Sequence, residues 1–449
     1  MMFFASSKFT IQKYTRLLAH SILQKIGGSG VGARLAYGTF WAFLGALISR
    51  GLLLCATILF ARILGKTEFG ELGVVQSTIG MFGVFAGFGL GLTTTKYVAE
   101  HRQNDPGRAG RIIGISSIFA ALMGGIMAGI LLIFAPWLAE NTLNAPHLAG
   151  ALRISAIILF LNAINGMQTG TLSGLEAFKT IAIVNLVSGL LSFPILIAGA
   201  YLGGVTGAVW AMAANLAIGW LLNHLAMRRE AGRFGIPLSW RDCGSELPVL
   251  WKFSFPATLA SSLVGPVNWI CIAILVSSAR GYEEMGIYSA ANHWYMMILF
   301  LPSVLSTVLL PMLSQQMARN EVSSSNKTLL LAIKMNLLIA LPIILAGSLA
   351  SPFIMGLYGE DFAEGWPTLV VVLVTAGIVI AQVPVGQIIA ASGKMWLGFT
   401  MNMGWAVVFV AGTLLLAQEG SLGLATARCI AYIFHSVWTF GFAFLLLKR

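Results

Sequence analysis

Long apolar stretches separated by short polar turns run along almost the whole chain. Each is long enough for a helix that crosses a bilayer, which takes about 20 mostly apolar residues. Six stretches are predicted in each half of the chain, near residues 37–60, 71–95, 112–134, 148–170, 181–201, 205–226, 250–276, 285–312, 328–351, 367–390, 396–417 and 421–447. Glycine, proline and serine interrupt several of them, which membrane helices tolerate where their neighbours satisfy the backbone. The pattern predicts an all-α polytopic membrane protein with about 12 transmembrane helices.

The polar turn after the first stretch returns in the second half of the chain. Three positions recur 216 residues later, where Gly65, Glu68 and Gly70 correspond to Gly281, Glu284 and Gly286. At the same offset Gln76 corresponds to Asn292. Because six crossings return the chain to its starting side, the repeat is expected to be parallel, with two six-helix bundles related by an axis along the membrane normal. Such repeats are typical of transporters whose halves rock about a central site.

Composition supports the membrane prediction and excludes several classes of site. Hydrophobic residues make up 57% of the chain and charged residues 10%, whereas soluble domains carry about 25% charged residues. The four cysteines are scattered and have no histidine partners at the spacing of a metal site. We therefore expect no disulfide framework, no metal and no cofactor.

The distribution of positive charge predicts the orientation in the membrane. If the N-terminus is cytoplasmic, most of the 27 lysines and arginines fall in cytoplasmic segments, and only Arg62, Lys66 and Arg280 fall in outside loops. This asymmetry follows the positive-inside rule, so both termini are predicted to be cytoplasmic in a multi-pass protein of the inner membrane. The net charge of +11 is then explained by topology, and no nucleic-acid partner is expected.

These charges also divide the chain into predicted parts. Residues 1–36 are basic, with the apolar spacing of an amphipathic helix on an anionic membrane surface; a poorly ordered basic tail fits them equally well. Residues 37–227 are predicted to form an N-lobe, residues 228–249 a polar cytoplasmic linker that allows the lobes to move, and residues 250–449 a C-lobe. The loops are too short to fold as a soluble catalytic domain, so no enzyme is expected.

Charged residues inside the predicted helices are the main candidates for a binding site. Arg50 lies deep in the first stretch, and it is predicted to line a water-filled cavity rather than to bond neighbouring helices, because an ionised side chain near the bilayer centre costs at least about 2.5–3.5 kcal/mol. Arg153 and Arg428 lie nearer the outer ends and are expected to extend to the interface. No acidic residue lies deep in a stretch. A cavity whose charged residues are arginines suits an anion such as phosphate, rather than an organic cation.

Uncharged polar residues add weaker candidates. Gln76, Asn268 and Asn292 lie in the second, seventh and eighth stretches, with His293 beside the last of them. They are candidates for contacts with sugars, although interhelical hydrogen bonds explain each one equally well. His293 is a candidate for protonation, but a lone histidine is more often structural.

Three short motifs resemble those of the polysaccharide transporter family. They are Ala61-Arg-Ile-Leu-Gly-x-x-Glu-Phe-Gly70, Gly87-Phe-Gly-Leu-Gly91 and Lys96-Tyr-Val-Ala-Glu100. This family contains the O-antigen and lipid-linked oligosaccharide flippases of the MATE-like multidrug/oligosaccharidyl-lipid/polysaccharide exporter superfamily. The resemblance implies a MATE-like fold with a V-shaped, cationic central cavity formed by the first, second, seventh and eighth helices. The lipid II flippase branch commonly has two further helices, so it is the less expected branch.

What the resemblance implies about function is alternating-access transport of an undecaprenyl-pyrophosphate-linked oligosaccharide to the outer leaflet. Arg50 would hold the pyrophosphate, with Lys96, Arg153 and Arg428 as secondary candidates. Coupling to protons or sodium and contact with polysaccharide polymerase or assembly partners are left open. Two alternatives remain: a cation-coupled multidrug exporter of the same fold, or a membrane enzyme of polysaccharide assembly such as a polymerase.

Overall fold

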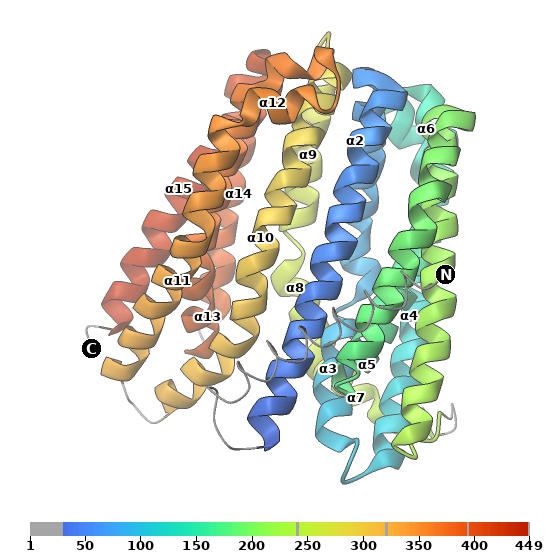
Figure 1. The fold of residues 1–449 in the computed structure, drawn as a ribbon, viewed down its shortest axis with the longest axis vertical. Helices are drawn as coiled ribbons and strands as arrows, with labels where there is room; N and C mark the ends of the chain where they lie inside the picture. The colour runs from blue at the N-terminus through green and yellow to red at the C-terminus, as the bar shows by residue number, and fades with distance from the viewer. Residues whose placement is uncertain (1–29, 239–241, 319–321, 393–394, 448–449) are drawn as a thin grey trace, which may run out of the picture.

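The chain folds into long, closely packed helices (Figure 1), and the computed structural model describes residues 30–238, 242–318, 322–392 and 395–447. No strand occurs in these ranges. The helices are α2 (Gly30–Gly87), α3 (Leu90–His101), α4 (Pro106–Trp137), α5 (Ala149–Gly174), α6 (Phe178–Arg233), α7 (Leu247–Val249), α8 (Phe255–Ser261), α9 (Val264–Val276), α10 (Gly281–Ala318), α11 (Val322–Leu349), α12 (Ser351–Gly356), α13 (Trp366–Ala391), α14 (Met395–Leu416) and α15 (Gly420–Leu447). Most of the predicted N-terminal segment 1–36 lies outside the described residues.

Two of the longest helices are pairs of helices joined by sharp turns. Inside α2, Gly65 adopts φ 74°, ψ 177°, and inside α6, Gly204 adopts φ 54°, ψ −140°. Positive φ values favour glycine, which has no Cβ to clash. Six stretches of the described chain are long and apolar enough to cross a membrane. Two of them, Phe178–Arg233 and Trp396–Leu445, each contain two predicted membrane segments. Divided at these turns, the described helices contain the predicted membrane segments of both halves.

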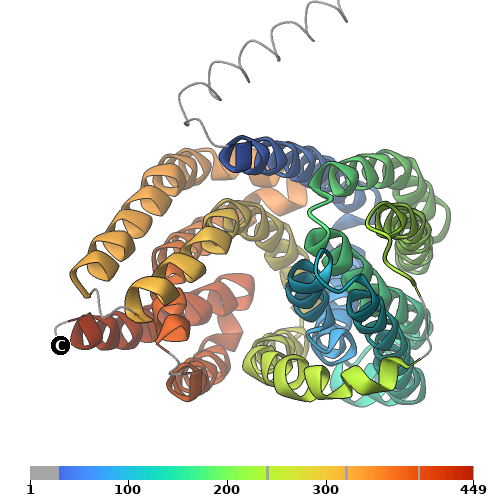
Figure 2. The same ribbon diagram turned by 90° about the horizontal axis from the view of Figure 1, so that it is seen from below.

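The helices form two lobes. Helices α2 to α6 make one lobe and α10 to α15 the other, as the view from below shows (Figure 2). In Figure 1 the lobes lie close together at the top, beside α12, and spread apart toward the bottom. The lobes are therefore closed against each other at the end that carries the turn at Gly65.

The second half repeats the backbone of the first at the predicted offset. Gly204 and Gly420 begin the last helix of each lobe with nearly the same conformation, φ 54°, ψ −140° and φ 60°, ψ −135°. A Cβ on these glycines would lie 3.0 Å from the carboxylate of Glu68 and 2.6 Å from that of Glu284. Glu284 accepts a hydrogen bond from the Ser421 amide at 2.8 Å. In each half a glutamate thus lies at a helix N-terminus, where negative charge is stabilising, and the expectation of a parallel repeat is confirmed.

The closed end is built around a contact between two glycines of the repeat. A Cβ on Gly70 would overlap the carbonyl of Tyr282, and a Cβ on Gly286 would overlap that of Lys66, its repeat equivalent. The two contacts are therefore related by the pseudo-symmetry of the halves. Close approach of helix backbones through small residues is a common way for membrane helices to pack. Around this crossing, Lys66 pairs with Glu283 at 3.6 Å.

The connection between the lobes is docked rather than free. Glu246 is buried and pairs with Arg108 at 3.1 Å and Arg111 at 3.6 Å, both in α4. Farther along, Ser254 hydrogen-bonds Thr93 of α3 at 2.6 Å. The last part of the predicted polar linker, residues 228–249, is therefore held on the first lobe. The seventh membrane segment, from α7 to α9, is interrupted at residues 262–263, and its first part packs on that lobe.

Candidate functional site

A cavity of about 630 Å³ lies between the two lobes. Its walls come from the second part of α2, from α9 and α10, and from α13 and α15. The polar and charged lining residues are Gln76, Ser77, Asn268, Tyr288, Ser289, Asn292, His293, Tyr295, Arg428 and Tyr432. Gly73, which packs against Ser289 beside the glycine crossing, also lines it. The expected contribution of the first helix is not seen among the described lining residues, and the twelfth membrane segment, α15, supplies the positive charge.

Arg428 is the charged residue of this cavity wall. Its Nη1 donates hydrogen bonds to Tyr288 Oη and to Asn292 Oδ1, each at 2.9 Å. The guanidinium carbon lies 4.0 Å from the centre of the Tyr295 ring, a cation–π distance. The residue is only 5% exposed. These contacts hold the guanidinium in one place at the cavity.

The charge of Arg428 has no counterion within the part of the chain described. No carboxylate lies within 4 Å of it there, and its buried Nε has no acceptor. Two neutral hydrogen bonds and a ring offset only part of the cost of removing a cation from water, which is several kcal/mol. A buried, uncompensated guanidinium therefore provides a favourable site for an anion, above all for a phosphate group.

The repeat shows that the fold itself does not require this arginine. Its equivalent in the first half is Met212, whose sulfur lies 3.8 Å from Gln76 Nε2, just as Arg428 contacts Asn292. The equivalents of Tyr288 and Tyr295 are Leu72 and Ile79, and both are buried. Since apolar side chains fill the same positions in the first lobe, the arginine and its tyrosines are present for a reason other than packing.

The expectation that Arg428 extends to the outer interface is wrong. Its position near the outer end of α15 led to that prediction, but the structure turns the side chain inward between α10 and α15. The Tyr288 hydroxyl and the Asn292 side-chain oxygen accept hydrogen bonds from its Nη1 there, which offsets part of the cost of leaving water. The 216-residue offset relates this contact to one in the first lobe. Gln76 contacts Met212 of α6, and the equivalent residues 216 positions later are Asn292 of α10 and Arg428 of α15.

The other predicted polar residues lie at the same cavity. Gln76, Asn268, Asn292 and His293 all line it. Asn268 donates to the carbonyl of Val264 at 2.7 Å, which fixes its amide within its own helix. His293 Nδ1 lies 2.7 Å from the carbonyl of Ser289. The structure thus brings together four residues from three different predicted helices.

The remaining predicted cations lie away from the described lining. Arg50 is exposed where α2 meets α10, with Nη1 3.5 Å from the Met296 carbonyl and its guanidinium 4.3 Å from the Phe300 ring. Lys96 lies 4.6 Å from the ring of Phe253, and Arg153 is exposed near the start of α5. Met296 itself lines the cavity, so Arg50 stands at its margin.

Comparison with known families decides where this chain belongs. Residues 35–317 match the family described as "Polysaccharide biosynthesis protein". The chain is a member of that family. The match begins in the first membrane segment and ends in α10, so it includes Arg50, the glycine crossing and most of the cavity wall.

Individual relatives of this family member extend the likeness beyond residue 317. The chain is 26% identical over 406 residues to the EPS I polysaccharide export inner membrane protein EpsE of Ralstonia nicotianae, covering 87% of this chain and 90% of that one. It is 24% identical over 295 residues to the lipid III flippase of Escherichia coli, covering 64% and 69%.

Solved structures confirm the predicted MATE-like fold of the family member. An inward-facing MATE family multidrug transporter superposes with a TM-score of 0.70 at 14% identity, over 96% of this chain and 98% of that one. The lipid II flippase MurJ, in an inward closed conformation, superposes with a TM-score of 0.67 at 15% identity, over 89% and 86%. At these identities the likeness concerns the fold alone, and it confirms an all-α polytopic membrane protein.

Proposed function

We propose that the protein is a flippase that moves an oligosaccharide linked to an undecaprenyl-pyrophosphate-type lipid across the cytoplasmic membrane. The observation that carries the proposal is Arg428, a buried cation at a cavity between two lobes, with no carboxylate partner in the described chain. Family membership and relatives named for polysaccharide export and lipid III flipping support a saccharide carried on an anionic lipid.

The cavity suits the headgroup of such a lipid. The pyrophosphate would bind at Arg428, whose guanidinium is already positioned by Tyr288 and Asn292, so little conformational entropy is lost on binding. The amides of Gln76 and Asn268 and the tyrosine rings at the cavity would contact sugars. The polyprenyl chain would stay in the surrounding lipid.

Arg50 is proposed to act at the margin of the cavity. It lies between α2 and α10, beside Met296, where a lipid headgroup would pass from the bilayer into the space between the lobes. Its weak 3.5 Å contact leaves the guanidinium exposed and available to phosphate oxygens. Lys96 and Arg153 remain secondary candidates.

The orientation follows from the charge asymmetry of the loops. The end at which the lobes spread apart would face the cytoplasm, with both termini on that side, and the glycine crossing would close the outer end. The name of the relative EpsE, a polysaccharide export inner membrane protein, agrees with a protein that loads its substrate inside. Transport would then consist of opening the glycine crossing while the opposite end closes.

Cysteine labelling tests this orientation. In a background without the four native cysteines, Ser245→Cys in the docked connection and Asn141→Cys at the opposite end would each be exposed. An impermeant maleimide added to intact cells is expected to modify position 141 and to leave position 245 unmodified until the membrane is opened. Labelling of position 245 from outside would reverse the proposed topology.

Reconstitution tests the function itself. Purified protein in liposomes is expected to expose a fluorescent lipid-linked oligosaccharide to an impermeant quencher faster than protein-free liposomes do. Export of an organic cation without movement of this lipid would favour the multidrug exporter instead. Conversion of the lipid to a longer saccharide without movement would favour a polymerase. Relatives named as transporters and flippases rather than enzymes support the first outcome.

A further inference from the structure

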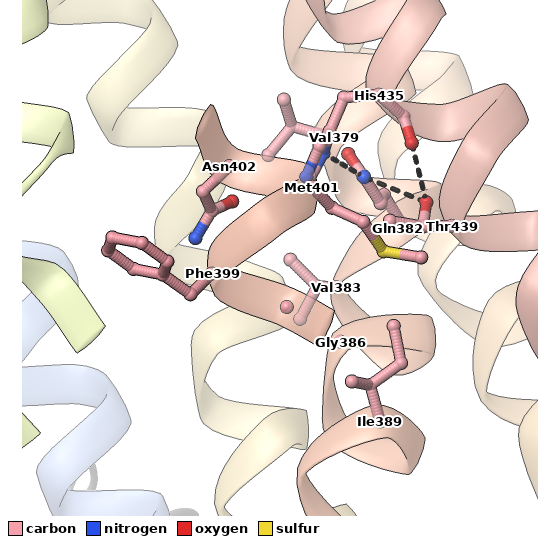
Figure 3. A pocket seen from close by; sticks show the side chains of 11 residues that line it. Val379, Gln382, Val383, Gly386, Ile389, Phe399, Met401, Asn402, His435 and Thr439 are labelled. Carbon is pink, nitrogen blue, oxygen red and sulfur yellow. Dashed lines mark hydrogen bonds between the residues drawn. The ribbon is translucent and has the colours of Figure 1, made fainter. Parts of the chain in front are cut away.

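A second cavity, of about 300 Å³, lies inside the C-terminal lobe (Figure 3). It is lined by α13, α14 and α15, and most of its lining is apolar. Its polar lining residues are Gln382, Asn402, His435 and Thr439. Val379 lines both this cavity and the central one, so the two cavities are neighbours. The volume is enough for several water molecules, each of which occupies about 30 Å³ in the liquid.

Three of these polar residues form one hydrogen-bonded group. The Gln382 side-chain nitrogen contacts both His435 Nδ1 and Thr439 Oγ1, the latter at 3.0 Å. Thr439 also donates to the carbonyl of His435 at 2.9 Å. Figure 3 shows these contacts as dashed lines at one side of the cavity. Gln382 and Thr439 are both buried.

The geometry leaves His435 with an unused ring nitrogen. When Gln382 donates to Nδ1, a neutral imidazole carries its own proton on Nε2. This buried Nε2 has no partner among the described residues. A buried donor left without an acceptor costs about 1–3 kcal/mol, so packing alone is a poor reason to place a histidine here.

Gln382 is a partner that can serve both charge states of the histidine. A glutamine amide has donor and acceptor ends. Turning the amide over would place its oxygen against a protonated Nδ1. The Thr439 hydroxyl, which can rotate, would then donate to the same oxygen. The contacts among the three side chains are therefore kept when the ring takes up a proton, and only the bond from Thr439 to the His435 carbonyl is given up.

His435 is also placed on the same face of α15 as the anion site. Arg428, Tyr432, His435 and Thr439 follow the three- and four-residue spacing of one helix face. Seven residues of α-helix separate Arg428 from His435, which is about 10 Å along the axis.

No other titratable group of the packed helices contacts His435 in the described chain. Helices α13 and α14 contain no titratable residue. On α10, Tyr288 and Tyr295 face Arg428, and His293 contacts its own backbone. Cys271 of α9 is buried, and Lys327 and Lys334 of α11 are exposed. The charge nearest to His435 along this face is thus Arg428.

We propose that His435, with Gln382 and Thr439, is a proton-binding site in the C-terminal lobe, and that its protonation strengthens anion binding at Arg428. The second half of this statement rests on the proposed function. A proton on His435 places a second positive charge near the bound anion, and the linkage is reciprocal, so anion binding also favours proton uptake. With an effective dielectric constant of about 20, unit charges about 10 Å apart correspond to roughly a tenfold change in affinity.

The proton site is tested on the substrate-free protein. The chain has six histidines, so selective isotope labelling of the imidazoles gives few nuclear magnetic resonance signals, and His435→Gln identifies the one from His435. We expect this signal to shift as the ring takes up a proton when the pH is lowered across the range in which the protein stays folded. A signal that stays in one state across that range would overturn the proposal.

Its link to the anion site is tested with a short-chain prenyl-pyrophosphoryl sugar, whose phosphates have no titratable proton near neutral pH. Calorimetry in two buffers of different ionisation enthalpy is expected to show proton uptake on binding, and about tenfold tighter binding below the titration range of His435 than above it. His435→Gln should lose both effects while still binding the probe. His224→Gln, a control on α6 where the ring stacks on Trp220, should keep both.

The outcomes separate this inference from the function it rests on. If the wild-type protein fails to bind the probe while the His435 signal titrates, the proposed substrate class is refuted and the proton site is supported. If the probe binds but His435→Gln keeps the same proton uptake, the link between the two sites is overturned. Gln382→Leu, which removes the acceptor, should reduce proton uptake as His435→Gln does.

Discussion

Replacing Arg428 with methionine is expected to reduce transport of the lipid-linked oligosaccharide by about a hundredfold or more, because the anion would lose its buried charged partner. The fold should survive, since methionine is the residue found at the equivalent position of the first lobe, Met212. Removing a buried charge that has no carboxylate partner also removes the cost of its desolvation. The measurement is flipping in liposomes, together with the thermal stability of the purified protein.

Matched variants make this prediction specific to charge. Arg428→Lys should keep part of the activity, because a point charge remains but the planar fork is lost. Met212→Leu should leave activity unchanged. Full transport by a stable Arg428→Met protein, combined with loss of transport in Arg50→Ala, would move the anion site to Arg50. A loss of activity that only follows a loss of stability would make Arg428 a structural residue.

Replacing Gly70 with alanine is expected to open the end of the molecule that the structure shows closed. The added Cβ would overlap the carbonyl of Tyr282. Overpacking of this kind costs about 1–3 kcal/mol, which corresponds to at least about a fivefold shift toward the conformation that is open at this end. Labelling of a cysteine at the cavity position of Gln76 by an impermeant reagent from outside should rise accordingly.

The pseudo-symmetry provides an internal test of the same idea. Gly286→Ala should have the same effect, because its Cβ would overlap the carbonyl of Lys66. Gly125→Ala, in α4, is the control, since a Cβ there meets nothing within 4 Å. Unchanged labelling in both crossing variants would show that the glycine contact does not govern closure.

Much of the architecture could be predicted from the chain because membrane helices need long apolar runs. The repeat offset correctly related Gly204 to Gly420 and Glu68 to Glu284, whose carboxylates occupy equivalent helix ends. The position of the connection between the lobes could not be predicted. Its polar composition does not show that Glu246 pairs with Arg108 and Arg111 of α4.

Only some residues of the candidate site could be predicted from the sequence. Gln76, Asn268, Asn292 and His293 could be placed at one cavity because their helices were assigned to it. The arginine that lines the cavity could not be chosen in this way. Arg50 is deeper in its predicted stretch than Arg428. In the structure, however, it is Arg428 that is buried and held by Tyr288, Tyr295 and Asn292.

The amino-acid pattern alone was enough to predict the number and order of the membrane segments, the parallel repeat, the charge asymmetry of the loops and the lack of acidic residues deep within the segments. It could not predict which side chains face the central cavity, which glycines touch, or that His435 contacts Gln382. A soluble helix shows its buried face as an apolar stripe, but a membrane helix is apolar both toward lipid and toward its neighbours. Its rotation is fixed by packing between helices, which the pattern along one segment does not contain.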